Sequence, residues 1–232
     1  MTKIYVYNPK HWKAPPLLAK ALRDRGLDAK ATSKANLLSK ADLVVCWGFR
    51  APNEALNNHI VGNKYRELEM LKNAGVNVPN FSQDKPEVDG WLARTLKHRA
   101  GNDLAANLMD GDFYVQKIDN VAHEFRVHVF GDKSIRAGIK VATENAHPWI
   151  RSLKQGWQLD YGQACQNVIK NKVRKAAKAA IKALNYDFGA VDVALLTSGK
   201  VIVFEVNSAP GLVTPNTAIA YAKTIEERFC QH

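Results

Sequence analysis

Two carboxylates and an amide near the C-terminus, Asp192, Glu205 and Asn207, are the residues whose types and spacing best suit metal binding. Carboxylates that face each other across a sheet repel, so a positive charge should lie between them unless one is protonated. Oxygen ligands suit Mg²⁺ or Mn²⁺, and Mg²⁺ usually takes one or two carboxylates together with substrate phosphates and water. These residues predict a metal site that works with a phosphorylated ligand. The alternative is a half-exposed hairpin whose polar side chains face water.

A β-hairpin would bring these three side chains together. Two apolar, strand-like runs, residues 188–196 and 201–206, flank a Ser-Gly pair, which predicts a hairpin with a two-residue loop at Ser198-Gly199. Thr197 then faces Lys200, and counting back along both strands places the two carboxylates directly opposite each other. The amide lies two residues further along, on the same face. The apolar neighbours of the second carboxylate favour the metal site over the exposed hairpin.

Composition limits the class of protein. The 232 residues can form one large domain or two small ones, and the 46% hydrophobic content is ordinary for a globular protein. No apolar run reaches the roughly 18 residues that a membrane span needs, and residues 1–9 lack the apolar core of a signal peptide. Cys46, Cys165 and Cys230 are widely spaced and form neither a disulfide framework nor a zinc pattern. We therefore expect a cytoplasmic protein without a membrane partner.

The net charge of +11 favours an anionic partner. Residues 161–186 contain no acid, but the stretch 170–182 holds six basic residues, and apolar residues recur on one face of the helix predicted there. One interpretation is an amphipathic helix with a solvated basic face. The other is a docking surface for an acidic polymer or nucleic acid.

The remaining elements are predicted from periodicity and from turn residues. A short β-α-β unit opens the chain and has no Gly-x-Gly-x-x-Gly pattern, so no dinucleotide site is expected. Asn63 can cap a helix over residues 64–73, which Gly75 closes. Residues 143–163 look irregular. Strands are expected at 4–7, 42–47, 91–95, 113–118, 125–130 and 135–141, and helices at 17–25 and 217–229.

Common catalytic motifs are absent. The run from His123 to His128 resembles a zinc-protease motif, but its histidines are five residues apart and the surrounding pattern is that of a strand. No serine or cysteine has the context of an activated nucleophile. The chemistry would then depend on a bound phosphoryl donor. Glu124, Arg126 and His128 alternate onto one strand face, as either a structural ion-pair strand or a site in which the arginine stabilises phosphate charge.

The order of these motifs resembles the ATP-grasp superfamily, and in particular its glutamate-ligase-like carboxylate–amine ligases. The likeness runs from Asn63 to Leu212. Its most specific part is Asp192 followed by Phe204-Glu205-Val206-Asn207-Ser208-Ala209-Pro210-Gly211-Leu212, which looks like the family's metal signature. Asn63-Lys64 before a helix and the run 75–79 after it look like the entry to the nucleotide lobe. The family's flap would fall at residues 96–102, where this chain has one glycine instead of several.

The resemblance implies a site residue by residue. Arg94 would touch ATP phosphates, Gln116-Lys117-Ile118 would be the hinge that reads adenine, and Glu124 would hold the ribose. Metal ligands would be Asp192, Glu205 and Asn207, and the catalytic cations near the transferred phosphate would be Arg126, Lys140 and Arg151. Residues that contact the nucleotide would be Lys64, Arg94, Gln116, Lys117, Ile118, Glu124 and Ser152. Two residues after Arg151, where many relatives have Asn, this chain has Leu153.

The resemblance also implies an α+β fold and a function. We expect a short α/β unit over residues 1–60 and an ATP-grasp domain over 61–232, with lobes at about 61–115 and 116–232. The expected activity is an ATP- and Mg²⁺- or Mn²⁺-dependent ligase that joins a carboxylate to an amine through an acyl phosphate. The candidate substrates are an amino acid, a peptide or a group on an acidic macromolecule. Both a monomer and a homo-oligomer are compatible with the sequence. The alternative is a nucleic-acid-binding or scaffold protein that keeps the fold without turnover.

Overall fold

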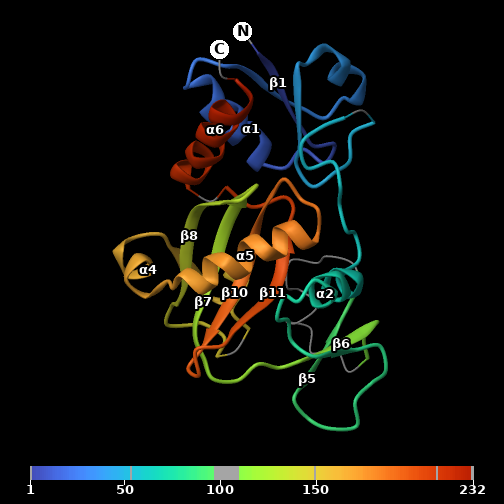
Figure 1. The fold of residues 1–232 in the computed structure, drawn as a ribbon, viewed down its shortest axis with the longest axis vertical. Coiled ribbons are helices and arrows are strands. Elements are labelled where there is room, and N and C mark those ends of the chain that lie inside the picture. The colour runs from blue at the N-terminus through green and yellow to red at the C-terminus, as the bar shows by residue number, and fades with distance from the viewer. Residues whose placement is uncertain (1, 53, 97–109, 149, 213, 231–232) are drawn as a thin grey trace.

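A computed structural model of the chain describes residues 2–52, 54–96, 110–148, 150–212 and 214–230. Helices and strands mix along the chain in an α+β arrangement that contains three sheets (Figure 1). A small parallel sheet lies at one end of the molecule, the largest sheet lies in the middle, and a second small sheet lies at the other end.

The N-terminal unit is a three-stranded parallel sheet in the order β2-β1-β3. The strands are β1 (Lys3–Tyr7), β2 (Asp28–Thr32) and β3 (Leu43–Cys46), with helix α1 (Ala14–Arg23) after β1 and a 3-10 helix η1 (Ala35–Lys40) before β3. The sequence predicted only two strands here and missed β2. That strand pairs with β1 alone at the sheet edge, so its sequence, Asp-Ala-Lys-Ala-Thr, needs no apolar run.

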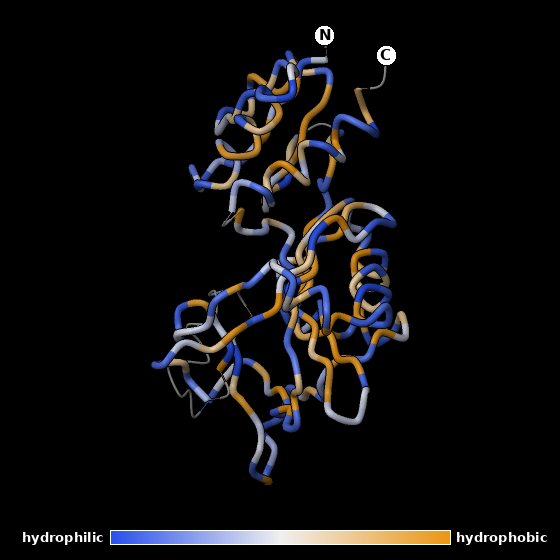
Figure 2. The backbone as a smooth tube through the Cα atoms, turned by 90° about the vertical axis from the view of Figure 1, so that its left-hand side faces the viewer, coloured by the Kyte–Doolittle hydropathy of each residue, from blue (hydrophilic) through white to orange (hydrophobic). Residues whose placement is uncertain are grey.

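The C-terminal helix α6 (Pro215–Phe229) belongs spatially to this N-terminal unit. It packs beside α1 and encloses one apolar core with β1, β3 and the ends of two strands of the large sheet. Figure 1 shows α6 next to α1, and both termini lie at that end of the molecule in Figures 1 and 2. Residues from the two ends of the chain therefore share a hydrophobic cluster.

The lobe at the other end is built from helix α2 (Lys64–Asn73) and the antiparallel sheet β4-β6-β5. Its strands are β4 (Phe81–Ser82), β5 (Trp91–Arg94) and β6 (Phe113–Gln116). The cap predicted for α2 is confirmed, because the Asn63 side chain accepts a hydrogen bond from the backbone N–H of Arg66 at 3.1 Å. Gly75 follows the helix with a φ of +77°, a conformation that glycine adopts without strain.

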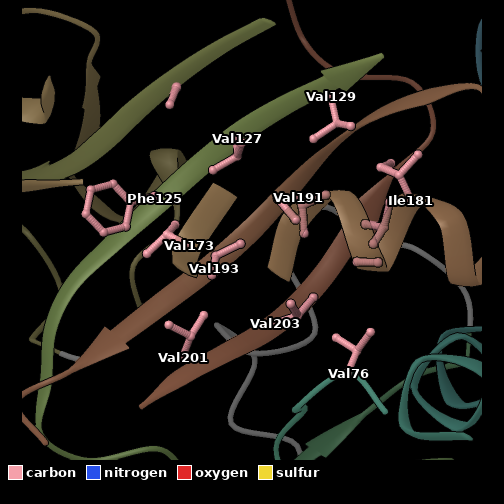
Figure 3. Packing of buried hydrophobic residues seen from close by; sticks show 14 of the residues in the cluster. Val76, Phe125, Val127, Val129, Val173, Ile181, Val191, Val193, Val201 and Val203 are labelled. Carbon is pink, nitrogen blue, oxygen red and sulfur yellow. The ribbon is translucent and has the colours of Figure 1, made fainter. Parts of the chain in front are cut away.

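The central sheet has five antiparallel strands in the order β11-β10-β7-β8-β9. They are β7 (Val121–Phe130), β8 (Lys133–Ala142), β9 (Trp157–Asp160), β10 (Phe188–Leu196) and β11 (Val201–Asn207). One face of the sheet packs on the basic helix α5 (Asn171–Ala183), with valines of three strands against Val173 and Ile181 (Figure 3). In Figure 2, hydrophilic and hydrophobic segments alternate along this helix, as its amphipathic pattern predicts.

The stretch predicted to be irregular, residues 143–163, is only partly so. It contains a short 3-10 helix η2 (Leu153–Gln155) and the edge strand β9, and a short helix α4 (Gln163–Val168) follows. The sequence missed β9 because its four residues, Trp-Gln-Leu-Asp, contain no apolar run and are only partly buried. No helix in the described ranges is long and apolar enough to cross a membrane.

The C-terminal hairpin confirms the predicted pairing of Asp192 with Glu205, although its loop differs from the prediction. The loop has three residues, 197–199, because Leu196 rather than Thr197 pairs with Lys200. Gly199 has a φ of +82°, as a three-residue hairpin loop commonly requires. Val193 pairs with Val203, but Asp192 pairs with Glu205, so a β-bulge on β11 inserts one extra residue between these pairs. The bulge shifts the register back by one residue.

Candidate active site

A cleft of about 590 Å³ opens on the face of the central sheet opposite α5. Its walls come from β5 and β6, from the start of β7, from β8, β10 and β11, and from the loop before β9. Every site residue expected from the sequence lines it except Lys64, which lies behind Glu205. The lining holds six basic and four acidic side chains, so the cleft favours an anionic ligand. The basic ones are Arg94, Lys117, Arg126, Lys140, Arg151 and Lys154, and the acidic ones are Asp119, Glu124, Asp192 and Glu205.

The centre of the cleft is a buried ion-pair cluster around Asp192. Arg126 binds this carboxylate with two hydrogen bonds of 2.8 Å, one from Nε and one from Nη2. Lys140 lies 3.3 Å from the same carboxylate and also pairs with Glu124. The register explains this geometry, because residue 126 of β7 pairs with residue 192 of β10, and the other two side chains share that face.

Glu205 and Asn207 complete the cluster from β11. The bulge keeps Val203 and Val206 in the core and turns the two polar side chains to the cleft face. The Asn207 amide donates to Glu205 Oε1 at 3.2 Å, and the ammonium group of Lys64 lies 3.5 Å from Glu205 Oε2. Arg126 and Lys140 therefore accompany Asp192, and Lys64 accompanies Glu205, so each of the opposed carboxylates has a cation beside it.

The cations change the protonation of the buried acids. Burial by itself would raise the pKa of Asp192, but the charges of Arg126 and Lys140 outweigh it and hold the pKa below its usual value. The pKa of Glu124 is raised, because burial is the largest effect and its ion pair with Lys140 offsets it only in part. Asp192 is thus held in its ionised form, as a potential metal ligand must be.

The donor set fits a magnesium ion bound together with phosphates. Two carboxylates and one amide offer hard oxygen atoms, which is the protein share that Mg²⁺ commonly takes. No group of three or more acidic, histidine or cysteine side chains suited to a metal is found among the residues that the structure describes, so phosphate or water oxygens would complete the shell. The buried Lys64 ammonium has its ion pair with Glu205 at 3.5 Å but no hydrogen-bond partner within that same part of the chain, so its N–H donors suit a site that receives an anion.

The expected hinge lines the other end of the cleft. The backbone N–H of Gln116 donates to Asn80 O at 2.8 Å, and that of Lys117 donates to Gly90 O at 2.8 Å. These two donors are therefore already used, and Ile118 is the hinge residue for which no backbone hydrogen bond is seen in the described segments. Arg94 lines the cleft from β5, as expected. The flap expected at residues 96–102 lies outside the described residues from 97 onward.

Arg151 and Ser152 lie in the loop that covers the cleft before β9. Arg151 donates to Val121 O at 3.1 Å, and its guanidinium group stacks 4.9 Å from the centroid of the Trp157 ring. These contacts hold the cation at the cleft wall. The alternation predicted for the strand face of Glu124 and Arg126 also brings His128 there, but His128 is fully buried and bonds Tyr161 and Tyr221 at 3.2 Å each.

Sequence reasoning missed Glu67, a buried acid on α2. Its Oε1 accepts a hydrogen bond of 2.8 Å from the backbone N–H of Val206, so it fastens the helix to the strand that carries Glu205. Burial raises the pKa of Glu67 to about 8. The sequence held no signal for this role, because a Glu in a polar helix looks like a solvent-facing residue.

Comparison with known proteins agrees with this architecture. No protein-family profile matches the chain, and neither does any curated protein. Among solved structures, the ATP-grasp ligase PsnB complexed with a minimal precursor has a TM-score of 0.69 at 13% identity, covering 97% of this chain and 99% of that one. The macrocyclase MdnC with precursor peptide MdnA, from Microcystis aeruginosa MRC, has a TM-score of 0.65 at 14% identity, covering 98% and 100%. The D-alanine–D-alanine ligase from Bacillus anthracis has a TM-score of 0.63 at 14% identity, covering 97% and 93%. The chain has the ATP-grasp fold.

Proposed function

We propose that the protein is an ATP-dependent ligase that joins a carboxylate to an amine. The observation that carries this proposal is the cleft of an ATP-grasp fold in which Asp192 and Glu205 face each other among buried cations. Such a cleft suits a magnesium–nucleotide complex, because its charges match those of the metal and of the phosphates. No side-chain nucleophile is needed, which agrees with the lack of one in the sequence.

The residues divide by the part of the ligand that they would hold. Asp192, Glu205 and Asn207 are the proposed magnesium ligands, and bound Mg²⁺ would neutralise the charge that develops on the phosphates. Gln116, Lys117 and Ile118 would receive the adenine, and Glu124 would hold the ribose. The proposed phosphate contacts and catalytic cations are Lys64, Arg94, Arg126, Lys140, Arg151 and Ser152.

Arg126 would bind both Asp192 and the phosphates during the proposed reaction. It is now bound to Asp192 through both carboxylate oxygens. A carboxylate has about four lone-pair sites, so Asp192 can accept a cation beside the guanidinium group. The guanidinium group has five N–H donors, and the donors that do not face Asp192 could bind phosphate oxygen. The ion pair would then position Arg126 in advance and lower the cost of ordering it when the nucleotide arrives.

The proposed reaction has two steps. A carboxylate oxygen of one substrate attacks the γ-phosphorus of ATP, the bond to the β-phosphate oxygen breaks, and ADP leaves. The amine then attacks the carbonyl carbon of the acyl phosphate, phosphate leaves with the electrons of the C–O bond, and the amine loses one proton. Arg126, Lys140 and Arg151 would stabilise the negative charge during the phosphoryl transfer.

The names of structurally similar proteins suggest a substrate class. PsnB has been solved with precursor peptide PsnA2 and MdnC with precursor peptide MdnA, and the third protein is a D-alanine–D-alanine ligase. We therefore infer that at least one of the two substrates of this chain is an amino acid or a peptide. The cationic cleft is compatible with the carboxylate of either.

Calorimetric titration with Mg·ATP tests the site directly. Glu205→Gln should weaken binding of Mg·ATP by about tenfold or more, because a charged metal ligand is lost. Glu144→Gln changes an exposed glutamate outside the cleft and should bind like the unchanged protein. Equal affinity in both variants would contradict the metal assignment. Product analysis adds a second test, since the proposal requires ADP and phosphate, and AMP with pyrophosphate would contradict it.

A further inference from the structure

A second concave site lies at the N-terminal unit, apart from the nucleotide cleft. It is an open groove of about 490 Å³ with a mostly apolar lining. The groove lies between the start of α1, the end of β3 and the loop that follows β11. Its lining residues are Trp12, Lys13, Ala14, Leu17, Trp47 and 209–212.

The walls of the groove are fixed by hydrogen bonds. The Asn8 side chain accepts from the backbone N–H of Trp12 at 3.3 Å and donates to Trp47 O at 2.8 Å, which ties the end of β1 to the end of β3. The indole N–H of Trp47 donates to Pro210 O at 3.2 Å and so holds the loop after β11. Gly48 has a φ of +78°, and a Cβ there would lie 2.8 Å from the Trp12 ring, so glycine is required for this packing.

The position in the sheet is one where open α/β sheets bind ligands. In the order β2-β1-β3, the strand that follows β1 in the chain lies on one side of it, and β3 lies on the other side. The strand order therefore reverses between β1 and β3, which is the switch point of the sheet. Ligands of such sheets bind in the crevice outside the carboxyl ends of these strands. Trp12 follows the carboxyl end of β1 and Trp47 follows that of β3. The groove is therefore at the predicted place for a ligand.

The exposed apolar surface in the groove favours an apolar ligand group. Trp12 and Leu17 each leave 44% of their surface exposed, although both are large hydrophobic residues. Lys13 is the one ionisable side chain of the lining, and no ion pair of Lys13 is seen in the described parts of the chain. Apolar surface beside a single cation suits a group that is hydrophobic and carries one negative charge.

The groove is continuous in the chain with the nucleotide cleft. Its floor, residues 209–212, begins two residues after Asn207, which lines the cleft. Ser208 lies between the two sites, and its carbonyl accepts a hydrogen bond of 3.0 Å from the Asn57 side chain. A substrate whose reacting group reached the cleft would therefore have this groove beside its remaining part.

We propose that the groove binds an aromatic or large aliphatic residue of the amino-acid or peptide substrate, with a carboxylate of that residue near Lys13. This inference rests on the proposed ligase function. It goes further because it names the chemical character of the substrate and the residues that select it, namely the exposed Trp12 and Leu17, which lie over the fully buried Trp47.

Fluorine NMR of protein labelled with 5-fluorotryptophan tests the groove without turnover. The probes are glycyl-phenylalanine, its amide and glycyl-alanine, each titrated into the full chain. Resonances of Trp12, Trp47 and Trp157 are assigned with the Trp12→Phe, Trp47→Phe and Trp157→Phe variants. We expect glycyl-phenylalanine to shift both resonances saturably, the amide to bind more weakly, and glycyl-alanine to bind at least about tenfold more weakly, since burying a phenylalanine side chain contributes that much.

A pair of matched variants controls the test. Leu17→Asp introduces a charge into the groove and should weaken glycyl-phenylalanine binding by about tenfold or more. Ile219→Asp changes another exposed hydrophobic residue, 46% exposed on α6 and outside the groove lining, and should bind as the unchanged protein does. Thermal melts of both variants identify any loss of folding, and Leu17→Ala provides a milder change at the same position.

The same spectra separate failure of this inference from failure of the proposed function. Trp157 packs against Arg151 at the nucleotide cleft, so its resonance should shift with Mg·ATP. If Mg·ATP shifts Trp157 while no dipeptide shifts Trp12 or Trp47, the groove inference is wrong and the nucleotide site stands. If no probe discriminates between phenylalanine and alanine, the apolar specificity is also wrong. If Mg·ATP shifts no resonance, the proposed function fails first.

Discussion

The ion pair between Arg126 and Asp192 is the residue-scale feature on which the candidate site depends. Both side chains are largely buried, with side-chain exposures of 16% and 6%. Taking charges out of water is costly, and removing Arg126 would leave Asp192 with Lys140, 3.3 Å away, as its remaining ion-pair partner in the described residues. Arg126 is therefore part of the folded structure as well as a proposed catalytic cation, and its loss should affect stability and turnover together.

The first prediction is that Arg126→Ala lowers the free energy of unfolding by about 3–5 kcal/mol, because Asp192 loses its main partner in the interior. Asp192→Asn combined with Arg126→Ala should cost less than the sum of the single changes. Urea denaturation measures all three. Lys20→Ala is the control, since its pair with Asp24 is exposed on α1 and should contribute about 1 kcal/mol or less. A cost for Arg126→Ala as small as that control would contradict the buried-pair argument.

The second prediction concerns His128 and pH. Burial lowers the pKa of His128 to about 3, so between that value and the unfolded value of 6.5 the folded state binds fewer protons than the unfolded state. The contribution of His128 to the free energy of unfolding is then fully present above pH 6.5. It falls as the pH drops, by about 2–3 kcal/mol between pH 7 and pH 4.5. The charged or ionisable groups that face His128 are Arg126, Arg136, Asp192, Tyr161 and Tyr221.

Denaturation at several pH values measures this effect. Between pH 7 and pH 4.5, the His128→Gln variant should lose about 2–3 kcal/mol less of its free energy of unfolding than the unchanged protein, because glutamine does not titrate. This holds even if the variant is less stable at pH 7. The exposed His59, changed to Gln, is the matched control. Parallel pH profiles for the unchanged protein and His128→Gln would show that other groups cause the acid sensitivity.

At the scale of elements, helix α2 positions two buried side chains of the site from outside the central sheet. Lys64 at its first turn approaches Glu205, and Glu67 bonds the backbone of β11. The helix is only ten residues long, so its stability depends on packing and on its cap. The cap therefore contributes to the geometry of the cleft as well as to the lobe.

The third prediction is that Asn63→Ala lowers the free energy of unfolding by about 1 kcal/mol, because the side chain that accepts from Arg66 N–H is lost. Asn73→Ala changes an exposed asparagine at the other end of the same helix and should alter stability by about 0.5 kcal/mol or less. Thermal denaturation compares the two variants. A larger effect at Asn73 than at Asn63 would contradict the assignment of the cap.

At the scale of the whole molecule, two surfaces with an excess of positive charge bear on function. One is the cleft, where basic side chains outnumber acidic ones. The other is α5, where Lys170, Lys175 and Lys182 are exposed and no ion pair with an acid is seen in the part of the chain that the structure describes. The first suits the proposed nucleotide. The second keeps open the two interpretations of the basic helix, a solvated face or a docking surface for an acidic polymer.

The fourth prediction separates these two interpretations. If α5 binds duplex nucleic acid, the logarithm of affinity should fall with the logarithm of salt concentration with a slope of about −0.9 per phosphate neutralised. Changing Lys170, Lys175 and Lys182 to Glu should then abolish binding and leave Mg·ATP affinity unchanged. The same reversal at Lys30, Lys34 and Lys40, exposed on the N-terminal unit, alters net charge equally and is the control. Filter binding measures the affinity of each protein for duplex DNA, single-stranded DNA and polyglutamate across a series of salt concentrations. Equal losses in both triple variants would indicate a net-charge effect and not a docking helix.

Much of the fold could be predicted because its elements carry local signals. The cap and end of α2, the apolar face of α5, and the strands of the hairpin all follow from residues close in sequence. The edge strands β2 and β9 could not, because neither Asp-Ala-Lys-Ala-Thr nor Trp-Gln-Leu-Asp contains a run of apolar or β-branched residues. The hairpin register was predicted correctly at Asp192 through two offsets that cancel, a longer loop and a bulge.

The sequence by itself determined which residues share a face within one strand or one hairpin. Strand alternation groups Glu124 with Arg126, and hairpin pairing groups Asp192 with Glu205, because both act over a few residues. The pairing of β7 with β10, which brings Arg126 to Asp192, joins segments far apart in the sequence and belongs to the tertiary structure. The tertiary structure decided how their charges are balanced. Whether Asp192 bonds Arg126 or lies open to a metal, and whether Glu67 is buried against β11, depends on contacts between distant segments. Those contacts form only when the lobes pack, because burial is what makes an unpaired charge costly and a paired one stable.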